Sequence, residues 1–371
     1  MINMKKTEEK GIILLKSAVL LTAVYFCAAE TALVKSAVTD GIDRCLSIVI
    51  PSLYAMMIVS VMIVKSGILS CIPRFAGSIG RMLFGMGAEN YAVFVFSMFA
   101  GYPAGAKIIT EQYSSGKITS GEASLLCGVC FGAGPAFIMG CISGTLYGSG
   151  TAGKIIIIST ISANILTAFA VSFFLRKSRN PAEASHRQIN ISGSLLTESV
   201  VSAGRTIGEL CFMITAFSVI TAMLERMGAV SAAAGIFSSV SGFSREVSEA
   251  FIPAVLDITA VRGLPADNYA LLPWICALVS SGGICVIFQT AAIIAGRFPL
   301  RKFILLRCTA SILSFGICRL IMPFMLRDEI IAVSSVNIGT YSAPSPVPSV
   351  MLLLMTFIIM AEYDKIVKIQ K

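Results

Sequence analysis

The chain has 371 residues, of which 56% are hydrophobic and only 13% are charged, and its formal net charge is +9. This share of charge is about half of what soluble domains carry, so the composition excludes an ordinary water-soluble fold and indicates lipid as the solvent. The basic residues lie in short segments between apolar stretches, a pattern that positive-inside topology explains better than a nucleic-acid-binding surface does. We therefore expect an all-α polytopic membrane protein that has the lipid bilayer and a small solute as partners, and no nucleic acid.

The first apolar stretch, residues 11–34, follows three lysines and resembles a signal peptide. It is longer than the apolar part of a signal peptide and further spans follow, so we interpret it as an uncleaved first helix. The other stretches of spanning length are 42–64, 121–148, 152–175, 203–228, 268–296, 302–326 and 349–363. The sequence thus predicts about eight transmembrane helices.

Four shorter stretches interrupt this series. Residues 68–87 and 231–244 mix polar and apolar side chains at helical spacing, which is typical of helices that lie in the membrane interface. Residues 90–109 and 247–263 carry helix breakers or polar residues near their middle. Because non-helical backbone at membrane depth survives only when protein or water covers it, we expect both segments to be re-entrant and to turn back.

The distribution of lysine and arginine tests this topology. If both segments turn back, both termini are cytoplasmic and most basic residues fall on the inner face. If 90–109 crossed the membrane instead, the basic hinge around residues 176–187 would move to the outer face, which the positive-inside rule rejects.

The same topology predicts an internal repeat. Each half has the order span, interfacial helix, re-entrant segment, broken span, span, and each half crosses an odd number of times, so the second half is inverted relative to the first. Inverted repeats with discontinuous segments are typical of secondary transporters. The predicted regions are an N-terminal transmembrane helix (1–41), a first repeat (42–175), a cytoplasmic hinge (176–202), a second, inverted repeat (203–326), and an outer loop, last transmembrane helix and short cytoplasmic tail (327–371).

The breaks supply the candidate substrate-binding residues of the first half. Glycine permits close approach of backbones and a proline frees a carbonyl group, so an unwound segment presents N–H and C=O groups to a ligand. The alternative is a kink in a packed helix, since glycine and proline are common in membrane helices. The candidates are Gly101, Tyr102, Pro103, Gly105 and Lys107 in the first re-entrant segment, with Gly134 and Pro135 in the broken span.

The second half offers matching candidates, which are Asp257, Thr259 and Arg262, followed by Gly282, Gly283 and Gln289. Lys107 and Arg262 occupy equivalent places, where they either bind an anion or extend to opposite interfaces as topology anchors. Asp257 either couples transport to H⁺ or Na⁺ or caps a helix, and Gln289 either binds ligand or joins two helices.

Nothing in the sequence predicts an enzyme or a cofactor. His186 is the single histidine and lies in the polar hinge, so no metal cluster or histidine-based triad is expected within one chain. Only Asp257 qualifies as a membrane aspartate, and no phosphate-binding Gly-Lys-Ser/Thr motif exists. The eleven cysteines, with Cys127 and Cys130 in a C-x-x-C, fall in apolar segments and are interpreted as small packing residues.

Several motifs together resemble a known family, the sporulation integral membrane proteins of the Gate, or nucleoside-recognition, superfamily. The motifs are Ile50-Pro51-Ser52-Leu53, Gly101-Tyr102-Pro103 through Lys107, Gly116-Lys117-Ile118 with Glu122-Ala123, Gly134-Pro135-x-Phe137-Ile138-x-Gly140, and Gly282-Gly283-Ile284-x-Val286-x-x-Gln289. The resemblance covers about residues 40–325. Where that family usually has Asn-Asn before the Gly-Pro, this chain has Phe131-Gly132-Ala133.

The resemblance implies a fold similar to concentrative nucleoside transporters and a role in carrying dipicolinic acid during sporulation. We therefore expect a transporter of a small anionic aromatic solute in the cell membrane or in the mother-cell-derived membrane around the forespore. The alternatives are a permease for nucleosides or other small solutes, and a membrane organiser of sporulation that does not transport.

Overall fold

The computed structural model describes residues 16–18, 20–68, 74–177, 193–266 and 268–326, which are mostly helical and contain no strand. The predicted last span at 349–363 and the predicted loop at 327–348 lie outside the described residues, as do residues 11–15 and most of the hinge.

The first half contains a long helix, a helical hairpin and a broken helix. The elements in chain order are α2 (Thr31–Arg44), the π-helical turn η1 (Cys45–Val49), α3 (Ile50–Ser66), α4 (Arg74–Phe84), α5 (Ala88–Ala100), α6 (Tyr102–Ser114), α7 (Ser120–Val129), the π-helical η3 (Phe137–Tyr147) and α8 (Gly150–Lys177).

The second half repeats this order of long helix, short helices and broken helix. Its elements are α9 (Gly193–Arg226), α10 (Ala229–Ser241), α11 (Arg245–Leu256), the 3₁₀ turns η4 (Ile258–Gly263) and η5 (Tyr269–Leu271), α12 (Leu272–Ser281), α13 (Gly283–Ile294) and α14 (Arg301–Met325).

Five helical stretches are long and apolar enough to cross a membrane, or six if the bent α4–α5 pair counts as one span. They are Thr31–Ile63, Gly150–Leu175, Gly193–Arg226, Tyr269–Ile294 and Arg301–Met325. These correspond to five of the predicted spans, and the chain is an all-α multi-pass membrane protein. The predicted span at 121–148 is split into α7 and η3 by the irregular residues 130–134.

The N-terminal region differs from the prediction. A short apolar helix covers Lys16–Ala29, and α2, η1 and α3 then form one unbroken helical rod, so residues 35–41 are not the loop that the predicted spans require. Gly41 does not break the helix but lets α2 approach α9, because a Cβ there would lie 2.8 Å from Thr215 Cα. The wide π-helical turn just before Pro51 accommodates that proline, whose missing N–H and ring would otherwise distort an α-helix.

Many large apolar side chains point outward from the long helices. Phe173 on α8, Phe212 on α9 and Phe324 on α14 are 72%, 78% and 83% exposed. A soluble protein does not expose apolar surface on this scale, whereas a lipid-facing surface requires it.

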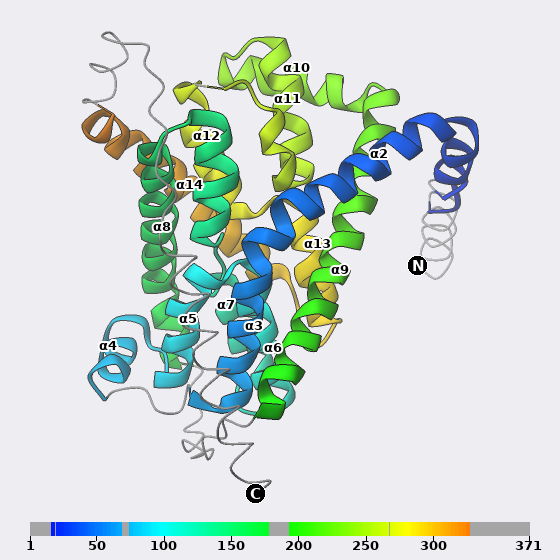
Figure 1. The fold of residues 1–371 in the computed structure, drawn as a ribbon. Helices are drawn as coiled ribbons and strands as arrows, with labels where there is room; N and C mark the ends of the chain where they lie inside the picture. The colour runs from blue at the N-terminus through cyan, green and yellow to red at the C-terminus, as the bar shows by residue number, and fades with distance from the viewer. Residues whose placement is uncertain (1–15, 19, 69–73, 178–192, 267, 327–371) are drawn as a thin grey trace, which may run out of the picture.

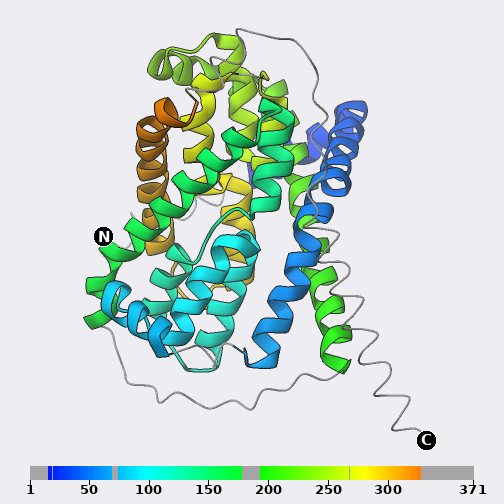
Figure 2. The same cartoon turned by 60° about the vertical axis from the view of Figure 1, so that its left-hand side comes forward.

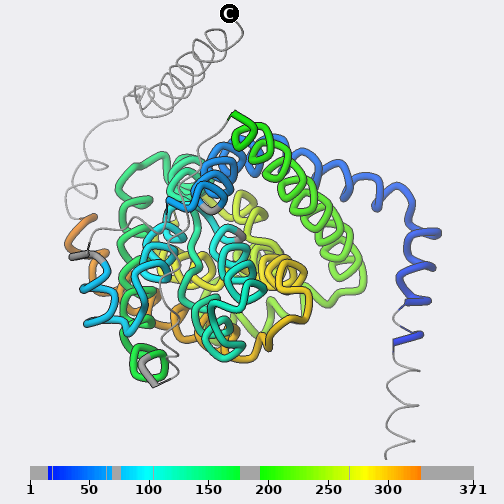
Figure 3. The backbone as a smooth tube through the Cα atoms, turned by 90° about the horizontal axis from the view of Figure 1, so that it is seen from below, coloured from blue at the N-terminus to red at the C-terminus, as the bar shows by residue number. Residues whose placement is uncertain are grey.

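The helices form a bundle in which the two halves pack together. In Figures 1 and 2, α4 lies at one end of the bundle and α10 at the opposite end. The α2–α3 rod runs along α9, while α8 and α14 pack against each other on another side. Seen from below in Figure 3, the start of α2 extends away from the bundle. The ends of the short helices α6, α11, η3 and α13 meet in the interior between these long helices.

Candidate functional site

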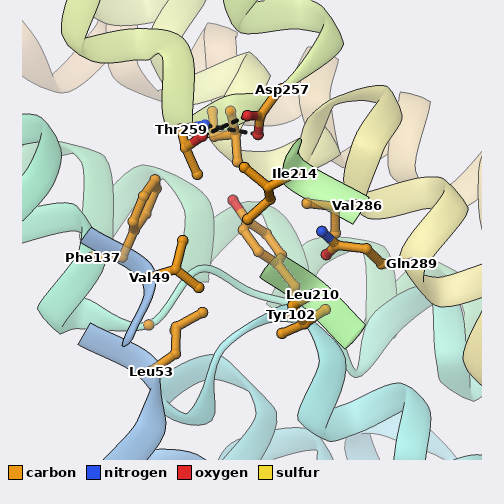
Figure 4. Close-up of a pocket in the computed structure, with 12 residues that line it drawn as sticks. Val49, Leu53, Tyr102, Phe137, Leu210, Ile214, Asp257, Thr259, Val286 and Gln289 are labelled. Atoms are coloured by element: carbon orange, nitrogen blue, oxygen red, sulfur yellow. Dashed lines mark hydrogen bonds between the residues drawn. The ribbon is translucent and has the colours of Figure 1, made fainter. Parts of the chain in front are cut away.

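A cavity lies where the helix breaks of both halves meet (Figure 4). About 470 Å³ of space there is not filled by atoms, and part of that space is open to the surroundings. Its walls are mainly apolar. They consist of Val49, Leu53, Tyr102, Gly134, Phe137, Leu210, Ile214, Asp257, Ile258, Thr259, Val286 and Gln289.

Asp257 forms the charged end of this cavity. Helix α11 ends at Leu256, and Asp257 adopts an extended conformation in which its side chain caps η4. Its carboxylate accepts from the Thr259 backbone N–H at 3.1 Å and from the Thr259 hydroxyl at 2.5 Å. At the predicted break, two hydrogen bonds from Thr259 therefore hold the carboxylate in place.

A buried arginine compensates the charge of Asp257. Arg44 Nη1 lies 3.1 Å from Asp257 Oδ2, and the exposed fractions of the two side chains are 11% and 2%. Arg44 Nη2 donates to the Ser218 hydroxyl on α9, and Arg44 Nε donates to the Asp40 carbonyl at 3.4 Å. An ion pair this deeply buried requires such additional hydrogen bonds, because desolvation of both charges opposes it.

The first hairpin brings its tip to the same cavity. Gly101 joins α5 to α6 with a φ of +93°, a conformation that favours glycine, and Pro103 stands in the first turn of α6. Tyr102 follows the tip, and its hydroxyl donates to the Val279 carbonyl at 2.7 Å near the end of α12. This hydrogen bond connects the hairpin of the first half to the broken helix of the second.

Glycines allow each hairpin to pack against the broken helix of its own half. A Cβ on Gly105 would collide with the Cys130 carbonyl oxygen, and one on Gly134 would lie 3.2 Å from the Phe99 carbonyl oxygen. In the second half, a Cβ on Gly283 would lie 3.1 Å from the Val255 carbonyl oxygen. The backbones thus meet directly, which agrees with the close-approach interpretation of these glycines.

A second buried arginine holds the two broken helices together. Arg307 on α14 is 1% exposed, donates to the Ser280 carbonyl at 3.2 Å and the Asn164 side-chain oxygen at 3.0 Å, and lies 4.9 Å from the centre of the Phe131 ring. Asn164 donates in turn to the Phe131 carbonyl at 2.7 Å. Because Ser280 belongs to the last turn of α12, the guanidinium also stabilises the negative end of that half-helix.

The two predicted cationic candidates lie elsewhere. Lys107 does not line the cavity, and its Nζ donates to the hydroxyls of Ser202 and Thr206, both at 3.1 Å. Arg262 forms an exposed ion pair with Asp43 at 3.1 Å. Neither Lys107 nor Arg262 is among the residues that line this cavity.

The remaining candidates lie around the cavity or behind its wall. Gln289 lines the cavity, and its side-chain nitrogen lies 3.3 Å from the Cys285 sulfur. Gly282 lies behind the wall, where a Cβ would lie 2.8 Å from the Phe131 ring. Pro135 is only partly buried and is not among the lining residues. Among the described residues, no group of three His, Cys, Asp or Glu side chains converges in a way that would hold a metal ion.

Sequence reasoning missed the two arginines that shape the site. Arg44 lies near the start of the predicted span 42–64, and the sequence identifies no partner for it. Arg307 lies inside the predicted span 302–326, also without a partner that the sequence identifies. In both cases the available signal was a charged residue within an apolar stretch, which is costly in a membrane unless a buried partner receives it.

No family model, no curated protein and no solved structure matches this chain.

Proposed function

We propose that this protein is a membrane transporter for a small solute, and that the solute binds in the cavity between the two halves. The single observation that supports this most directly is that breaks from three separate helical segments converge on one cavity with a buried carboxylate at its end. Broken helices in a membrane interior are tolerated where they line such a site, and transporters use them to bind solute.

The proposed topology has eight spans in two inverted repeats, with both termini cytoplasmic in the cell membrane. The similar order of elements in the two halves supports it, as does the position of α4 and α10 at opposite ends of the bundle (Figures 1 and 2). In this scheme the α5–α6 hairpin dips in from the cytoplasmic side and the α11–η4 segment from the outer side.

For the solute, we propose a small anionic aromatic compound such as dipicolinate, carried during sporulation. The main support is that the sequence motifs resemble those of the sporulation integral membrane proteins. The apolar walls and the rings of Tyr102 and Phe137 suit an aromatic compound. The nearest buried cation is Arg44, which an anion would reach only by competing with Asp257. We propose that Asp257 couples transport to H⁺ or Na⁺, because neutralising its carboxylate would free Arg44 to bind the solute.

An uncharged solute such as a nucleoside is the second candidate, favoured by a specific observation. No lysine or arginine is among the residues that line the cavity, while Thr259 and Gln289 offer hydrogen bonds to hydroxyl or amide groups.

Uptake into proteoliposomes tests the proposal. Labelled dipicolinate and labelled uridine are supplied separately under a pH gradient, a Na⁺ gradient or no gradient. We expect uptake of one compound above empty liposomes, and we expect Asp257→Asn to abolish its dependence on the gradient. Asp43→Asn, which removes a nearby exposed carboxylate, serves as the control. A membrane organiser without transport activity would show no uptake of either compound by the folded wild-type protein.

A further inference from the structure

A second, smaller cavity, with about 330 Å³ of space not filled by atoms, part of it open to the surroundings, lies along the same three helices as the first. It is lined by residues of α3 and α6 and by Ser202 of α9, whereas the first cavity is lined by other residues of these helices. It contains Lys107, the cation that the first cavity lacks.

One face of the α2–α3 rod connects the two cavities. Val49 and Leu53 line the first, while Met57, Val61 and Lys65 line the second, and each residue follows the previous one by four positions. Residues at this spacing lie on one face of a helix. Because an α-helix rises 1.5 Å per residue, Leu53 and Met57 are only about 6 Å apart along the axis.

A small apolar contact separates the cavities. Met57, Ala104 and Ile207, from α3, α6 and α9, belong to one buried cluster and are 1%, 2% and 4% exposed. The cluster also includes Leu210, which lines the first cavity, while Met57 and Ala104 line the second. The cluster therefore forms the wall between the two spaces.

The second cavity has the chemistry of an anion site. Lys107 projects toward it from α6, and the hydroxyls of Ser202 and Thr206 that accept from its Nζ are neutral. Lys65 also lines the cavity but pairs with Glu198 at 2.9 Å, and Glu111 is the one carboxylate among the lining residues. An ammonium surrounded by hydroxyl groups can exchange one of these partners for a carboxylate, which forms a stronger, charge-assisted hydrogen bond.

We propose that the two cavities are successive binding sites on one solute path along α3, α6 and α9. Lys107 receives a small carboxylate anion in the second cavity, and the contact between Met57, Ala104 and Ile207 is the closed gate to the first. This inference rests on the proposed transport function. Thiol labelling nevertheless tests the gate and the anion site separately, because it needs no transported solute.

The gate is tested by labelling a cysteine at position 53 in sealed proteoliposomes. A membrane-impermeant methanethiosulfonate reagent is added from one side at a time, and mass spectrometry of the peptide that contains position 53 separates this site from the native cysteines. We expect Met57→Ala to increase labelling of Leu53→Cys several-fold from the side that reaches Lys107. Met56→Ala removes the same atoms from a neighbouring position outside both cavities and should leave the rate unchanged. Ile207→Ala provides a second opening of the gate if Met57→Ala does not fold.

The anion site is tested with reagents of opposite charge. Ser60 lines the second cavity, and the variant Ser60→Cys is labelled with the sulfonate and the trimethylammonium forms of the reagent. We expect Lys107→Gln to lower the ratio of anionic to cationic labelling by about tenfold. Lys117→Gln is the matched control, because Lys117 pairs with Glu89 at 2.8 Å outside the cavity.

The outcomes separate this inference from the proposed function. Labelling of position 53 that is equal in the Met57, Ile207 and Met56 variants overturns the gate, and an unchanged charge ratio in Lys107→Gln overturns the anion site. Either result is compatible with solute uptake by the wild-type protein. Conversely, a wild-type protein that takes up neither dipicolinate nor uridine contradicts the proposed function for those solutes while both labelling results stand.

Discussion

Removing one member of the buried pair between Arg44 and Asp257 should destabilise the protein far more than removing both. The two groups are 3.1 Å apart, and at an effective dielectric constant of about 20 their attraction is about 5 kcal/mol before desolvation is counted. Loss of one partner from such a pair typically costs about 3–5 kcal/mol, because the other charge stays buried alone. Asp257 keeps two hydrogen bonds from Thr259, so we expect about 3 kcal/mol for Arg44→Gln.

The chain contains a matched control for this measurement. Asp43 is the neighbour of Arg44, and it pairs with Arg262, five residues after Asp257, at the same distance of 3.1 Å. That pair connects the same two segments, but its side chains are 36% and 59% exposed. Exposed pairs contribute about 0.2–1 kcal/mol, so its coupling energy should be several times smaller.

Double-mutant cycles measure both couplings. The variants Arg44→Gln, Asp257→Asn and their combination are compared with Asp43→Asn, Arg262→Gln and their combination, by denaturant titration of the protein in detergent followed by circular dichroism. We expect a coupling energy of about 3 kcal/mol for the buried pair. Equal couplings for the two pairs, or additive effects in the buried pair, would refute the claim that Arg44 neutralises Asp257 in the folded protein.

Three further changes follow from the geometry. Gly105→Ala should destabilise the protein by about 2 kcal/mol or more, because its Cβ collides with a backbone carbonyl, whereas Gly208→Ala, with nothing within 4 Å, should be neutral or slightly stabilising in the same titration. Arg307→Lys keeps the charge but cannot reproduce the planar set of donors that reaches a carbonyl and an amide, so we expect a lower unfolding midpoint and loss of folded protein on size-exclusion chromatography. Cysteines introduced at Ser185 and at Ser239 should react with an impermeant reagent from the cytoplasmic and the outer side, respectively, and reaction of both from one side would contradict the inverted arrangement.

The positions of the helix breaks could be predicted from the sequence because local residues determine them. Gly101 adopts a positive φ that other residues rarely tolerate, and Asp257 caps the turn after it, so each break is encoded within a few positions. The prediction of a loop at residues 35–41 was wrong, because the continuity of the helix Thr31–Ile63 depends on packing between distant segments. Gly41 looks like a loop residue locally, but its function is close packing against α9, which lies far away in the sequence.

The charge partners could not be predicted for the same physical reason. The ion pair between Arg44 and Asp257 joins residues 213 positions apart, and hydrophobic periodicity carries no information about which distant acid faces which base. Lys107 could be recognised as functional or structural from its apolar surroundings, but its place in a cavity separate from that of Asp257 depends on how α6 packs against α3 and α9.

The ion pair also constrains how the proposed transporter would move. Asp257 belongs to the break after α11, while Arg44 belongs to the rod that packs along α9 and is bonded to Ser218 on that helix. A motion of the α11–η4 segment therefore either separates the two charges, which is costly at this depth, or carries the rod and α9 with it. The gate between Met57, Ala104 and Ile207 is formed by this rod and α9 together with α6. A change of charge at Asp257 would thus be transmitted to the gate through contacts that already exist, and it is the α2–α3 rod, rather than either hairpin alone, that connects the carboxylate to the lysine cavity.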